Sequence, residues 1–379
     1  MTAIRESGPA PAPATDSPRR RWCWGTRLVV AAATAWSAFL LAHLLLTGEV
    51  WWWSIVELIP PIALAVPPIV LALAAIGAAR GVRWRVELIA AATAVIVAPM
   101  LGINPAALLA DGGAAEADLS VYSWNTDYWH TEGGDTPEAF YDHLLAQDVD
   151  VYLLQEYLTG IDWVEPIDDE AALRAHFAGW HIAIASELVT VSRYPIVEQR
   201  ALDTTGLIGP DDPGAPVEDD WDAYWTTKIL RTDVDVDGRI VSLYNVHFSV
   251  PVPTFGPSPL DGEFWDSVRG QYQRRAAQVE VLVEDLAANP HPVLVAGDFN
   301  STSLSGAVTA LRARLDCPDP DGEPFPVSWP RIRFGLPALW RLDWACAGGG
   351  ATVADYRFAA SAGLSDHDAQ HIHLNLEDR

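Results

Sequence analysis

The chain has 379 residues, of which half are apolar, and its formal net charge is −26 at pH 7. This length exceeds that of one typical domain. The negative charge excludes a protein that holds long nucleic acid on a broad basic surface. The charge is unevenly divided, because residues 1–116 carry a net +1 and residues 117–379 carry −27. The apolar residues are concentrated in the first part, so the sequence predicts an apolar N-terminal region followed by an acidic domain of soluble type.

The N-terminal region is expected to anchor the protein in a membrane. Residues 1–22 begin with a stretch rich in Pro, Ala and Ser, which is typical of a disordered tail. Residues 23–110 contain three apolar runs long enough to cross a bilayer as helices. These runs cover Leu28–Leu46, Ile55–Ala79 and Leu88–Leu109. The second run contains four prolines, which a membrane helix tolerates where its neighbours satisfy the freed carbonyl groups.

The arginines predict the orientation of these three transmembrane helices. They cluster before the first run and between the second and the third, and the loop after the first run has none. By the positive-inside rule, the N-terminus is cytoplasmic and the acidic domain is extracytoplasmic. A cleaved signal peptide fits poorly, because two further apolar runs follow and no small-residue cleavage site is evident. We therefore expect a multi-pass protein of the cell membrane, in contact with the lipid bilayer.

Residues 117–379 read as short strands alternating with helices and polar loops. Helical spacing is found at 136–147 and, over a long amphipathic stretch, at 267–289. A hairpin is expected at 226–250, with its turn at Asp237 and Gly238. The remaining strand regions that we expect are 119–127, 149–157, 187–196, 292–299, 339–347 and 362–376.

Polar residues stand at or just after the ends of the apolar strand runs. A single Asp, Asn or His in such a place is usually a turn former or a helix cap. Several of them arriving from six separate strand regions are more informative, because strand ends at one edge of a sheet sandwich converge on one cleft. The residues concerned are Asn125, Glu156, His247, Asp298, Asn300, Asp343, Asp366 and His367.

This set suits the hydrolysis of a phosphoester. Carboxylate and amide oxygens are the ligands of Mg²⁺, which keeps coordination positions for water and phosphate. The sequence has no Cys cluster and no HExxH motif, which disfavours zinc. Two histidines can donate hydrogen bonds to a phosphate or move a proton, and a carboxylate can hold one imidazole in a fixed tautomer. Together these groups indicate metal-assisted attack of water on phosphorus.

The ordered motifs SWNTD, LLQEY, YNVHFS, VAGDFNST, RLDWACA and SDHDAQH resemble those of the endonuclease/exonuclease/phosphatase superfamily, which has the DNase I-like fold. The segments VTVSRYPI and QYQRRAAQVEVL are similar to intervening segments of that family. The resemblance covers Asp118 to Leu376, and it implies a four-layer α/β sandwich for residues 117–379. The family often has Pro two residues after the SDH triplet, where this chain has Ala369, so the geometry of that loop is open to change.

The resemblance also implies a role for each strand-end residue. Glu156 matches the principal Mg²⁺ ligand, with Mn²⁺ as an alternative metal, and Asn125 and Asp366 match residues at or near the metal. His247 matches the histidine that contacts the scissile phosphate. Asp298 and Asn300 match the pair that positions the attacking water and stabilises pentacovalent phosphorus. His367 matches the catalytic histidine and Asp343 its orienting partner, and the motifs leave open whether Asp298 or His367 takes the proton from water.

The sequence therefore predicts a membrane-anchored, outward-facing, metal-dependent hydrolase that cleaves a phosphodiester in a nuclease-like manner. Nucleic acid, a lipid head group and a small molecule all stay open as substrates. The alternatives are a phospholipid or inositol-phosphate phosphoesterase similar to sphingomyelinases, and a non-catalytic membrane sensor on the same scaffold. Arg331, Arg333 and Arg341 form either a local basic patch or ordinary surface. Whether Cys317 and Cys346 form a disulfide is also open, because sequence alone does not show that they meet.

Overall fold

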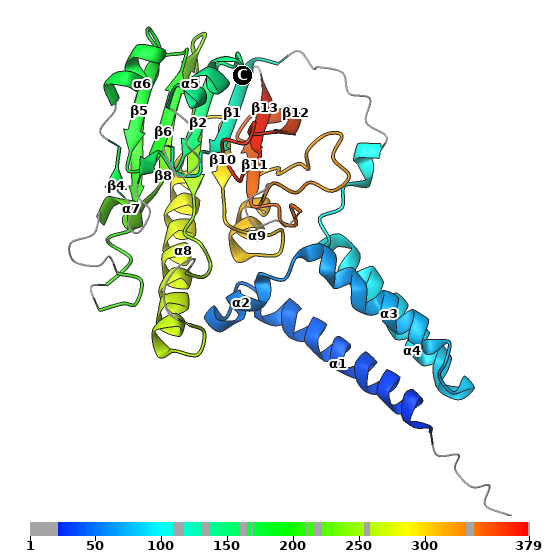
Figure 1. The fold of residues 1–379 in the computed structure, drawn as a ribbon. Coiled ribbons are helices and arrows are strands. Elements are labelled where there is room, and N and C mark those ends of the chain that lie inside the picture. Colours follow the sequence, from blue (N-terminus) through cyan, green and yellow to red (C-terminus); the bar gives the residue numbers. More distant parts are fainter. Residues whose placement is uncertain are drawn as a thin grey trace, which may run out of the picture.

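The computed structural model describes residues 22–108, 117–129, 137–159, 165–167, 170–209, 211–215, 222–253, 258–330 and 337–377. The predicted disordered tail lies outside these residues except for Trp22, and so do Arg331 and Arg333 of the possible basic patch. The rest of the chain forms an α/β domain with several helices at its N-terminal side (Figure 1).

Two sheets form the centre of the domain. The six-stranded sheet has the order β12-β13-β1-β2-β6-β5, and the five-stranded sheet has the order β11-β10-β9-β8-β7. A short hairpin, β3 and β4, stands apart (Leu158–Thr159 and Glu165–Pro166). The strands of the first sheet are β1 (Leu119–Asn125), β2 (Val151–Gln155), β5 (His181–Ala185), β6 (Leu188–Ser192), β12 (Ala351–Ala359) and β13 (Ala369–Leu376). Those of the second are β7 (Ile196–Asp203), β8 (Thr227–Val236), β9 (Arg239–His247), β10 (Val293–Asp298) and β11 (Asp343–Gly348).

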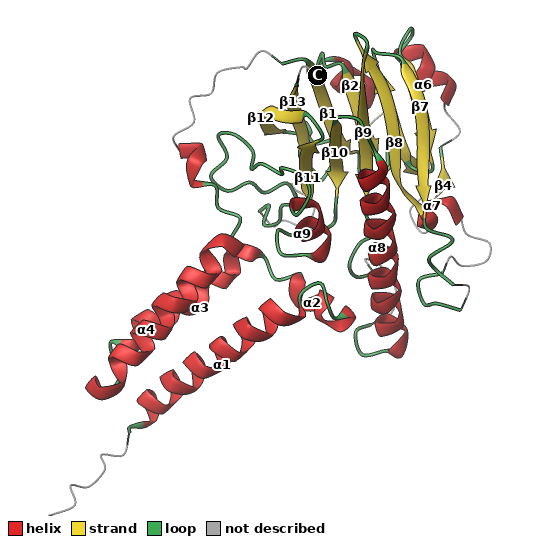
Figure 2. Cartoon of the chain, turned by 180° about the vertical axis from the view of Figure 1, so that it is seen from behind, coloured by secondary structure: helices red, strands yellow, loops and turns green. Residues whose placement is uncertain are grey.

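The two sheets pack face to face, and helices cover their outer faces. The core between the sheets joins Val121 and Leu153 of the first sheet to Leu243 and Leu294 of the second. Rings and aliphatic side chains of α5 (Pro137–Leu145) and α6 (Glu170–His176) pack on the outer face of the first sheet. The outer face of the second sheet is covered by α8 (Gly262–Ala288) and α9 (Gly306–Arg312), and a short α7 (Asp222–Thr226) precedes β8. The predicted four-layer α/β sandwich is confirmed (Figure 2).

The central strands run in the direction that gathers their carboxyl ends. β1 pairs with β2 in parallel, and β9 pairs with β10 in parallel. All four are buried along most of their length, which explains their apolar runs. The carboxyl ends of parallel neighbours meet at the same edge of a sheet, so the polar residues that close these strands come together there.

The expectation of three membrane-spanning helices is not supported. Within the described residues, α1 (Trp24–Leu46) is long and apolar enough to span a bilayer. The second predicted span is divided into η1–α2 (Trp51–Trp53 and Ser54–Glu57) and η2–α3 (Pro61–Ala65 and Val66–Ala75), which meet at an angle of 80°. Pro60 and Pro61 lie at that break, where proline cannot continue a helix.

The third predicted span differs in both its start and its end. The first half of helix α4 (Arg80–Val97) contains three arginines and ends at Glu87. Its apolar part, from Leu88 to Val97, is too short to cross a bilayer. After Val97 the chain passes through the short turns η3 (Ala98–Met100) and η4 (Pro105–Leu108). Between them Asn104 reaches the domain, where its Nδ2 donates to the Pro320 carbonyl at 2.9 Å.

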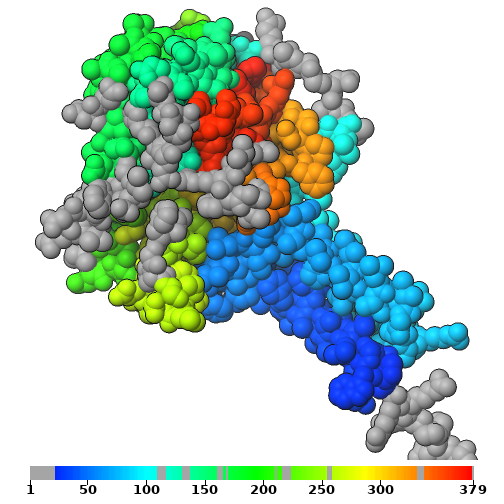
Figure 3. Space-filling view, viewed as in Figure 1, coloured from blue at the N-terminus to red at the C-terminus, as the bar shows by residue number. Residues whose placement is uncertain are grey.

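The N-terminal helices are docked on the domain at the side of α8 and α9 (Figures 1 and 3). The Trp340 indole donates to the carbonyl of Leu58 at 3.0 Å, and the Tyr272 hydroxyl donates to the carbonyl of Gly48 at 3.1 Å. The chain from Thr47 to Leu58, which follows α1 and includes η1 and α2, is thus fixed to the domain by hydrogen bonds.

Candidate active site

The residues that close β1, β2 and β10 meet across the two sheets. Nδ2 of Asn125, the last residue of β1, donates to Glu156 Oε1 and to Asp298 Oδ2, both at 3.0 Å. Glu156 follows β2 in the first sheet, and Asp298 ends β10 in the second. The Asn125 amide therefore joins two carboxylates from different sheets, as expected from the convergence of strand ends.

The pairing register of the second sheet brings Asp298 and two further site residues into one row. Asp298 is paired with His247 on one side and with Asp343 on the other. Gly297 makes this possible, because it has φ +142° and an added Cβ would lie 2.0 Å from the carbonyl oxygen of Val246. A side chain at this position would push β9 and β10 apart at the end that carries His247 and Asp298.

Glu156 is held in an unusual conformation and environment. Its φ is +59°, a value in the left-handed region that non-glycine residues seldom adopt. Its side chain is 17% exposed. Burial raises the pKa of Glu156 to about 7; Asp127 and Glu187 add to the increase and His247 opposes it. A backbone strained at the tip of a buried strand indicates that the position of this carboxylate matters more than local stability.

His247 belongs to a chain of buried polar groups that sequence reasoning did not find. Its Nδ1 lies 2.9 Å from Oε1 of Glu187, which also accepts a hydrogen bond from the ammonium of Lys228. Burial alone would raise the pKa of Glu187, but the two cationic partners lower it to about 2. The His247 Nε2 then points to Glu156 and Asp298, at 3.7 and 3.8 Å.

Sequence reasoning missed Glu187 because it stands before a strand, in the turn that leads from β5 into β6. The pattern that indicates the other site residues is a polar residue at the end of a strand, and Glu187 does not follow it. A signal was nevertheless present, since Lys228 is the chain's sole lysine and lies near the start of a buried strand. A lysine in such a place needs a buried carboxylate as its partner.

A second histidine–carboxylate pair stands on the other side of Asp298. Nδ1 of His367 lies 2.9 Å from Oδ2 of Asp343, as expected for an imidazole with an orienting partner. The His367 Nε2 lies 3.6 Å from Asp298 Oδ2. Burial by itself would lower the pKa of His367, but Asp343 and Asp298 raise it well above its usual value.

The last two predicted residues lie at the rim of the cluster. Asn300 has φ +46°, its backbone N–H donates to Asp298 Oδ1 at 2.7 Å, and its side-chain amide donates to the Phe248 carbonyl at 2.9 Å. Asp366 Oδ2 accepts a hydrogen bond from the Trp329 indole at 3.0 Å, and Asp366 Oδ1 lies 3.9 Å from His367 Nε2. Trp329 is a further residue at the site that the sequence did not single out.

The donor set fits a divalent cation with oxygen ligands. Glu156 and Asp298 bring two carboxylates to one largely enclosed position, where like charges are costly without a compensating cation; the Asn125 Nδ2 faces both, and its Oδ1 accepts from the Asp127 N–H. Next to them, Asp298, Asp343 and His367 have potential ligand atoms within 4.8 Å of one another. The predicted trio of Glu156, Asn125 and Asp366 and this second trio therefore share one polar cluster.

The comparison with family models identifies the class of protein. The model of the endonuclease/exonuclease/phosphatase family matches residues 122–367, and the chain belongs to this family. Members are generally phosphoester hydrolases and are typically dependent on divalent metals. The match begins at Tyr122 in β1 and ends at His367, so it includes every predicted site residue.

Solved structures that are similar to the chain have low sequence identity to it. An endonuclease/exonuclease/phosphatase from Beutenbergia cavernae has 17% identity and a TM-score of 0.47, over 69% of this chain and 72% of that one. Sphingomyelinase C from Streptomyces griseocarneus has 19% identity and a TM-score of 0.44, over 68% and 99%. A mannosyl-6-phosphatase from Bacteroides thetaiotaomicron has 13% identity and a TM-score of 0.43, over 68% and 99%. No curated protein matches the chain.

Proposed function

We propose that the protein is a metal-dependent hydrolase that cleaves a phosphodiester by attack of water on phosphorus. The observation that carries this proposal is the row of His247, Asp298 and Asp343 on adjacent strands, with the His367–Asp343 pair beside it. The imidazoles of His247 and His367 lie on either side of Asp298, and each has a carboxylate partner of its own. This arrangement suits a phosphate and the water that attacks it.

The metal is proposed to be held by Glu156, Asn125 and Asp366. Mg²⁺ is the preferred ion and Mn²⁺ the alternative, because the donors are carboxylate and amide oxygens. When bound, such an ion neutralises the charge of the phosphate and polarises its P–O bonds. The buried Glu156 supports this role, since a bound cation would offset the cost of ionising it there.

The remaining residues would bind the phosphate and move protons. Glu187 fixes His247 through Nδ1, which leaves Nε2 free to donate to a phosphate oxygen. Asp298 and Nε2 of His367 are 3.6 Å apart and face the same position, so either can accept the proton of the attacking water. Asn300 would stabilise the negative charge on the phosphoryl oxygens as water attacks the phosphorus. A non-catalytic sensor is disfavoured, because every residue that the chemistry needs is present.

The position of the site beside the N-terminal helices favours a lipid head group over nucleic acid as the source of the phosphodiester. Trp329 and Trp340, which form an isolated β-bridge with each other, connect the two: Trp329 donates to Asp366, and Trp340 donates to Leu58 of the N-terminal region. A charge of −27 on residues 117–379 also repels long nucleic acid. A phospholipid or inositol-phosphate head group is thus the favoured source of the phosphodiester, and it is compatible with the same mechanism.

The domain is proposed to face the outside of the cell, with α1 in the membrane and the N-terminus in the cytoplasm. The Arg-rich segment before α1 supports this orientation. The Cys317–Cys346 disulfide, whose formation the sequence left open, supports it independently. Disulfides persist in oxidising compartments and are rare in the cytosol.

The test is hydrolysis by the full-length protein in a neutral detergent, with Mg²⁺ and with EDTA. The substrates are plasmid DNA, RNA, sphingomyelin, phosphoinositides and bis-p-nitrophenyl phosphate, and Glu156→Gln serves as the blank. We expect metal-dependent cleavage of a lipid or model phosphodiester that the blank lacks. Cleavage of DNA in preference to every lipid would overturn the lipid assignment, and folded protein without metal-dependent cleavage of any substrate would contradict the proposed function.

A further inference from the structure

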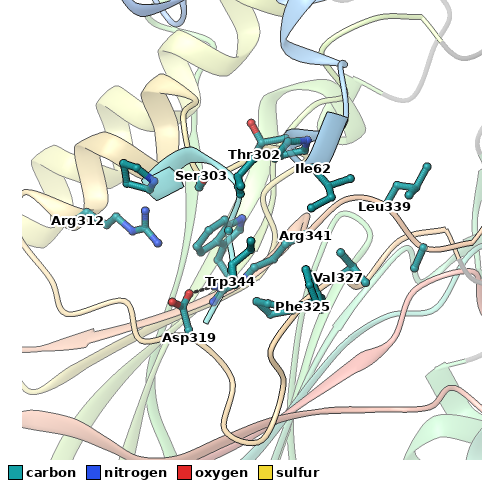
Figure 4. Close-up of a pocket in the computed structure, with 17 residues that line it drawn as sticks. Ile62, Thr302, Ser303, Arg312, Asp319, Phe325, Val327, Leu339, Arg341 and Trp344 are labelled. Atoms are coloured by element: carbon teal, nitrogen blue, oxygen red, sulfur yellow. Dashed lines mark hydrogen bonds and ion pairs between the residues drawn. The ribbon is translucent and has the colours of Figure 1, made fainter. Parts of the chain in front are cut away.

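A cavity of about 270 Å³ lies between the N-terminal helices and the catalytic domain. One wall comes from the ends of the helices nearest the domain, with Ile62, Leu101 and Ile103 as its apolar members. The opposite wall comes from the domain and includes Thr302, Ser303, Arg312, Arg341 and Trp344 (Figure 4). The cavity is therefore apolar on the helix side, and its domain side combines apolar residues with two arginines and Asp319.

The two arginines of the cavity differ in their partners. Arg341 is buried, forms an ion pair with Asp319, donates to the Pro318 carbonyl and lies 3.8 Å from the centre of the Trp344 ring. Arg312 lies over the same ring at 4.9 Å, and among the described residues it has neither an ion pair nor a hydrogen bond. Two guanidinium groups and one carboxylate, that of Asp319, therefore line the cavity. The N–H groups of Arg312 remain available to a ligand.

A second unpartnered polar group lies in the same wall. The Ser303 hydroxyl oxygen is buried and has no hydrogen-bond partner among the described residues. A buried polar atom without a partner costs free energy, and such atoms are uncommon in folded proteins. A free cation and an orphaned hydroxyl in one cavity are the groups that an anionic oxygen ligand would satisfy.

We propose that this cavity binds the phosphate of an anionic phospholipid, with Arg312 as the principal ligand and Ser303 as a second donor. The source is a lipid, because the helix-side wall is apolar and includes Ile62 of the bent pair, whose two halves together are apolar enough to form a broken membrane span. A volume near the lower end of the usual range for ligand pockets, about 300–1,000 Å³, suits a head group and its first carbons. The site is separate from the catalytic cluster and does not depend on the proposed reaction.

Occupancy is expected to stabilise the junction. Trp344 follows Asp343 in β11, and its indole donates to the carbonyl of Ser301 at 2.8 Å. Arg312 lies over the ring of Trp344, the donor of this bond, and Ser303 lies two residues after Ser301, the acceptor. A ligand held by Arg312 and Ser303 is therefore next to both residues of the bond, and it contacts the docked helices as well. Because it binds the folded state alone, it raises the midpoint of thermal unfolding.

The test is binding of short-chain phosphatidylglycerol to the full-length protein in a neutral detergent with EDTA, measured by calorimetry and by thermal unfolding. Phosphatidylcholine of the same chain length, sn-glycerol 3-phosphate and inorganic phosphate are the comparison ligands. We expect one saturable site for phosphatidylglycerol, with weak binding of the other three. Equal binding of phosphatidylcholine would overturn the anionic site, and equal binding of inorganic phosphate would overturn the lipid source.

Two variants on one helix end make the test specific. Arg312 and Arg314 are both exposed. Arg312→Gln removes the proposed ligand, whereas Arg314→Gln removes an arginine that follows α9 and donates to the carbonyl of Ala310. We expect Arg312→Gln to weaken phosphatidylglycerol binding at least tenfold and Arg314→Gln to leave it unchanged. Glu156→Gln should also leave it unchanged, which separates this site from the active site. Equal affinity of Arg312→Gln and wild type, with both folded, would contradict the proposal.

Discussion

At the scale of residues, the site depends on side chains that point toward one another from different strands. His247, Asp298 and Asp343 share one row of the second sheet, and Asn125 reaches Asp298 from the first sheet. Each contact needs a particular register, since a shift by one residue would turn these side chains to the opposite face. Gly297 secures the register by allowing β9 and β10 to approach at their carboxyl ends.

The His367–Asp343 pair gives a first prediction. Asp343→Asn keeps the size of the side chain but removes the charge that orients and supports the imidazole. We expect turnover to fall by at least about a hundredfold with little change in KM. In a double-mutant cycle with His367→Ala, the two losses should be far from additive, because both act through one imidazole. Additive losses would contradict a shared role.

Lys228 gives a second prediction, on stability. It is 2% exposed and pairs with Glu187, so Lys228→Met leaves a buried carboxylate without one of its two cationic partners. The expected loss is about 3 kcal/mol, seen as a melting temperature lower by several degrees. Arg193→Met is the matched control, because Arg193 and Asp148 form an exposed ion pair worth at most about 1 kcal/mol. Equal shifts in both variants would contradict this account.

All eight site residues that were predicted from the sequence lie in or beside one cluster, since a polar residue at the end of an apolar strand is visible in the sequence. Their individual roles remain predictions. The partners that hold them were harder to find. Glu187 stands at the start of a strand, and Trp329 belongs to an irregular segment, so neither follows the pattern that revealed the others. Such contacts depend on tertiary packing, which sequence spacing does not encode.

At the scale of elements, the strongly patterned segments were predictable. The hairpin of β8 and β9 turns at Asp237 and Gly238, as Asp-Gly between two strands indicates. The long helix was expected at 267–289 and is found as α8 over Gly262–Ala288. The N-terminal region was less predictable, because mean hydropathy identifies apolar residues but not the breaks between them. There, prolines and the charged start of α4 decide where helices end.

The disulfide gives a third prediction. Cys317–Cys346 joins the segment after α9 to β11 and closes a separation of 29 residues. Replacing both with Ser should lower the free energy of unfolding by about 3–4 kcal/mol through the regained entropy of the unfolded chain. Cys23→Ser removes an exposed free thiol and serves as the control. Unfolding midpoints that match in wild type and in the double variant would show that the bridge adds no stability.

At the scale of the whole molecule, the arrangement of the two parts relates the site to the helix that is proposed to lie in the membrane. The helices leave the domain on the side to which the carboxyl end of β10 points (Figure 1). The docked chain from Thr47 to Leu58 contacts Tyr272 of α8 and also Trp340. The proposed anchor therefore lies next to the part of the domain that carries the site. This arrangement would hold the catalytic edge near the lipid surface, where a head-group phosphodiester is available.

The orientation gives a fourth prediction. Protease added to intact cells should remove residues 117–379, because the domain is proposed to lie outside, while an N-terminal tag stays protected. Cells opened with detergent provide the control in which both parts are digested. Full protection of the domain in intact cells, with cleavage after opening, would reverse the topology.

The most direct measurement of the central claim is the Mg²⁺-dependent turnover of bis-p-nitrophenyl phosphate by the full-length protein and four variants. His367→Ala and Asp298→Asn change the proposed catalytic cluster. His181→Ala changes an exposed histidine at the start of β5, and Asp237→Asn changes an exposed aspartate in the turn between β8 and β9. We predict that the first two lower turnover by about a thousandfold or more at an unchanged melting temperature, and that the last two keep it. Equal turnover in all four variants, or turnover that persists in EDTA, would contradict the account.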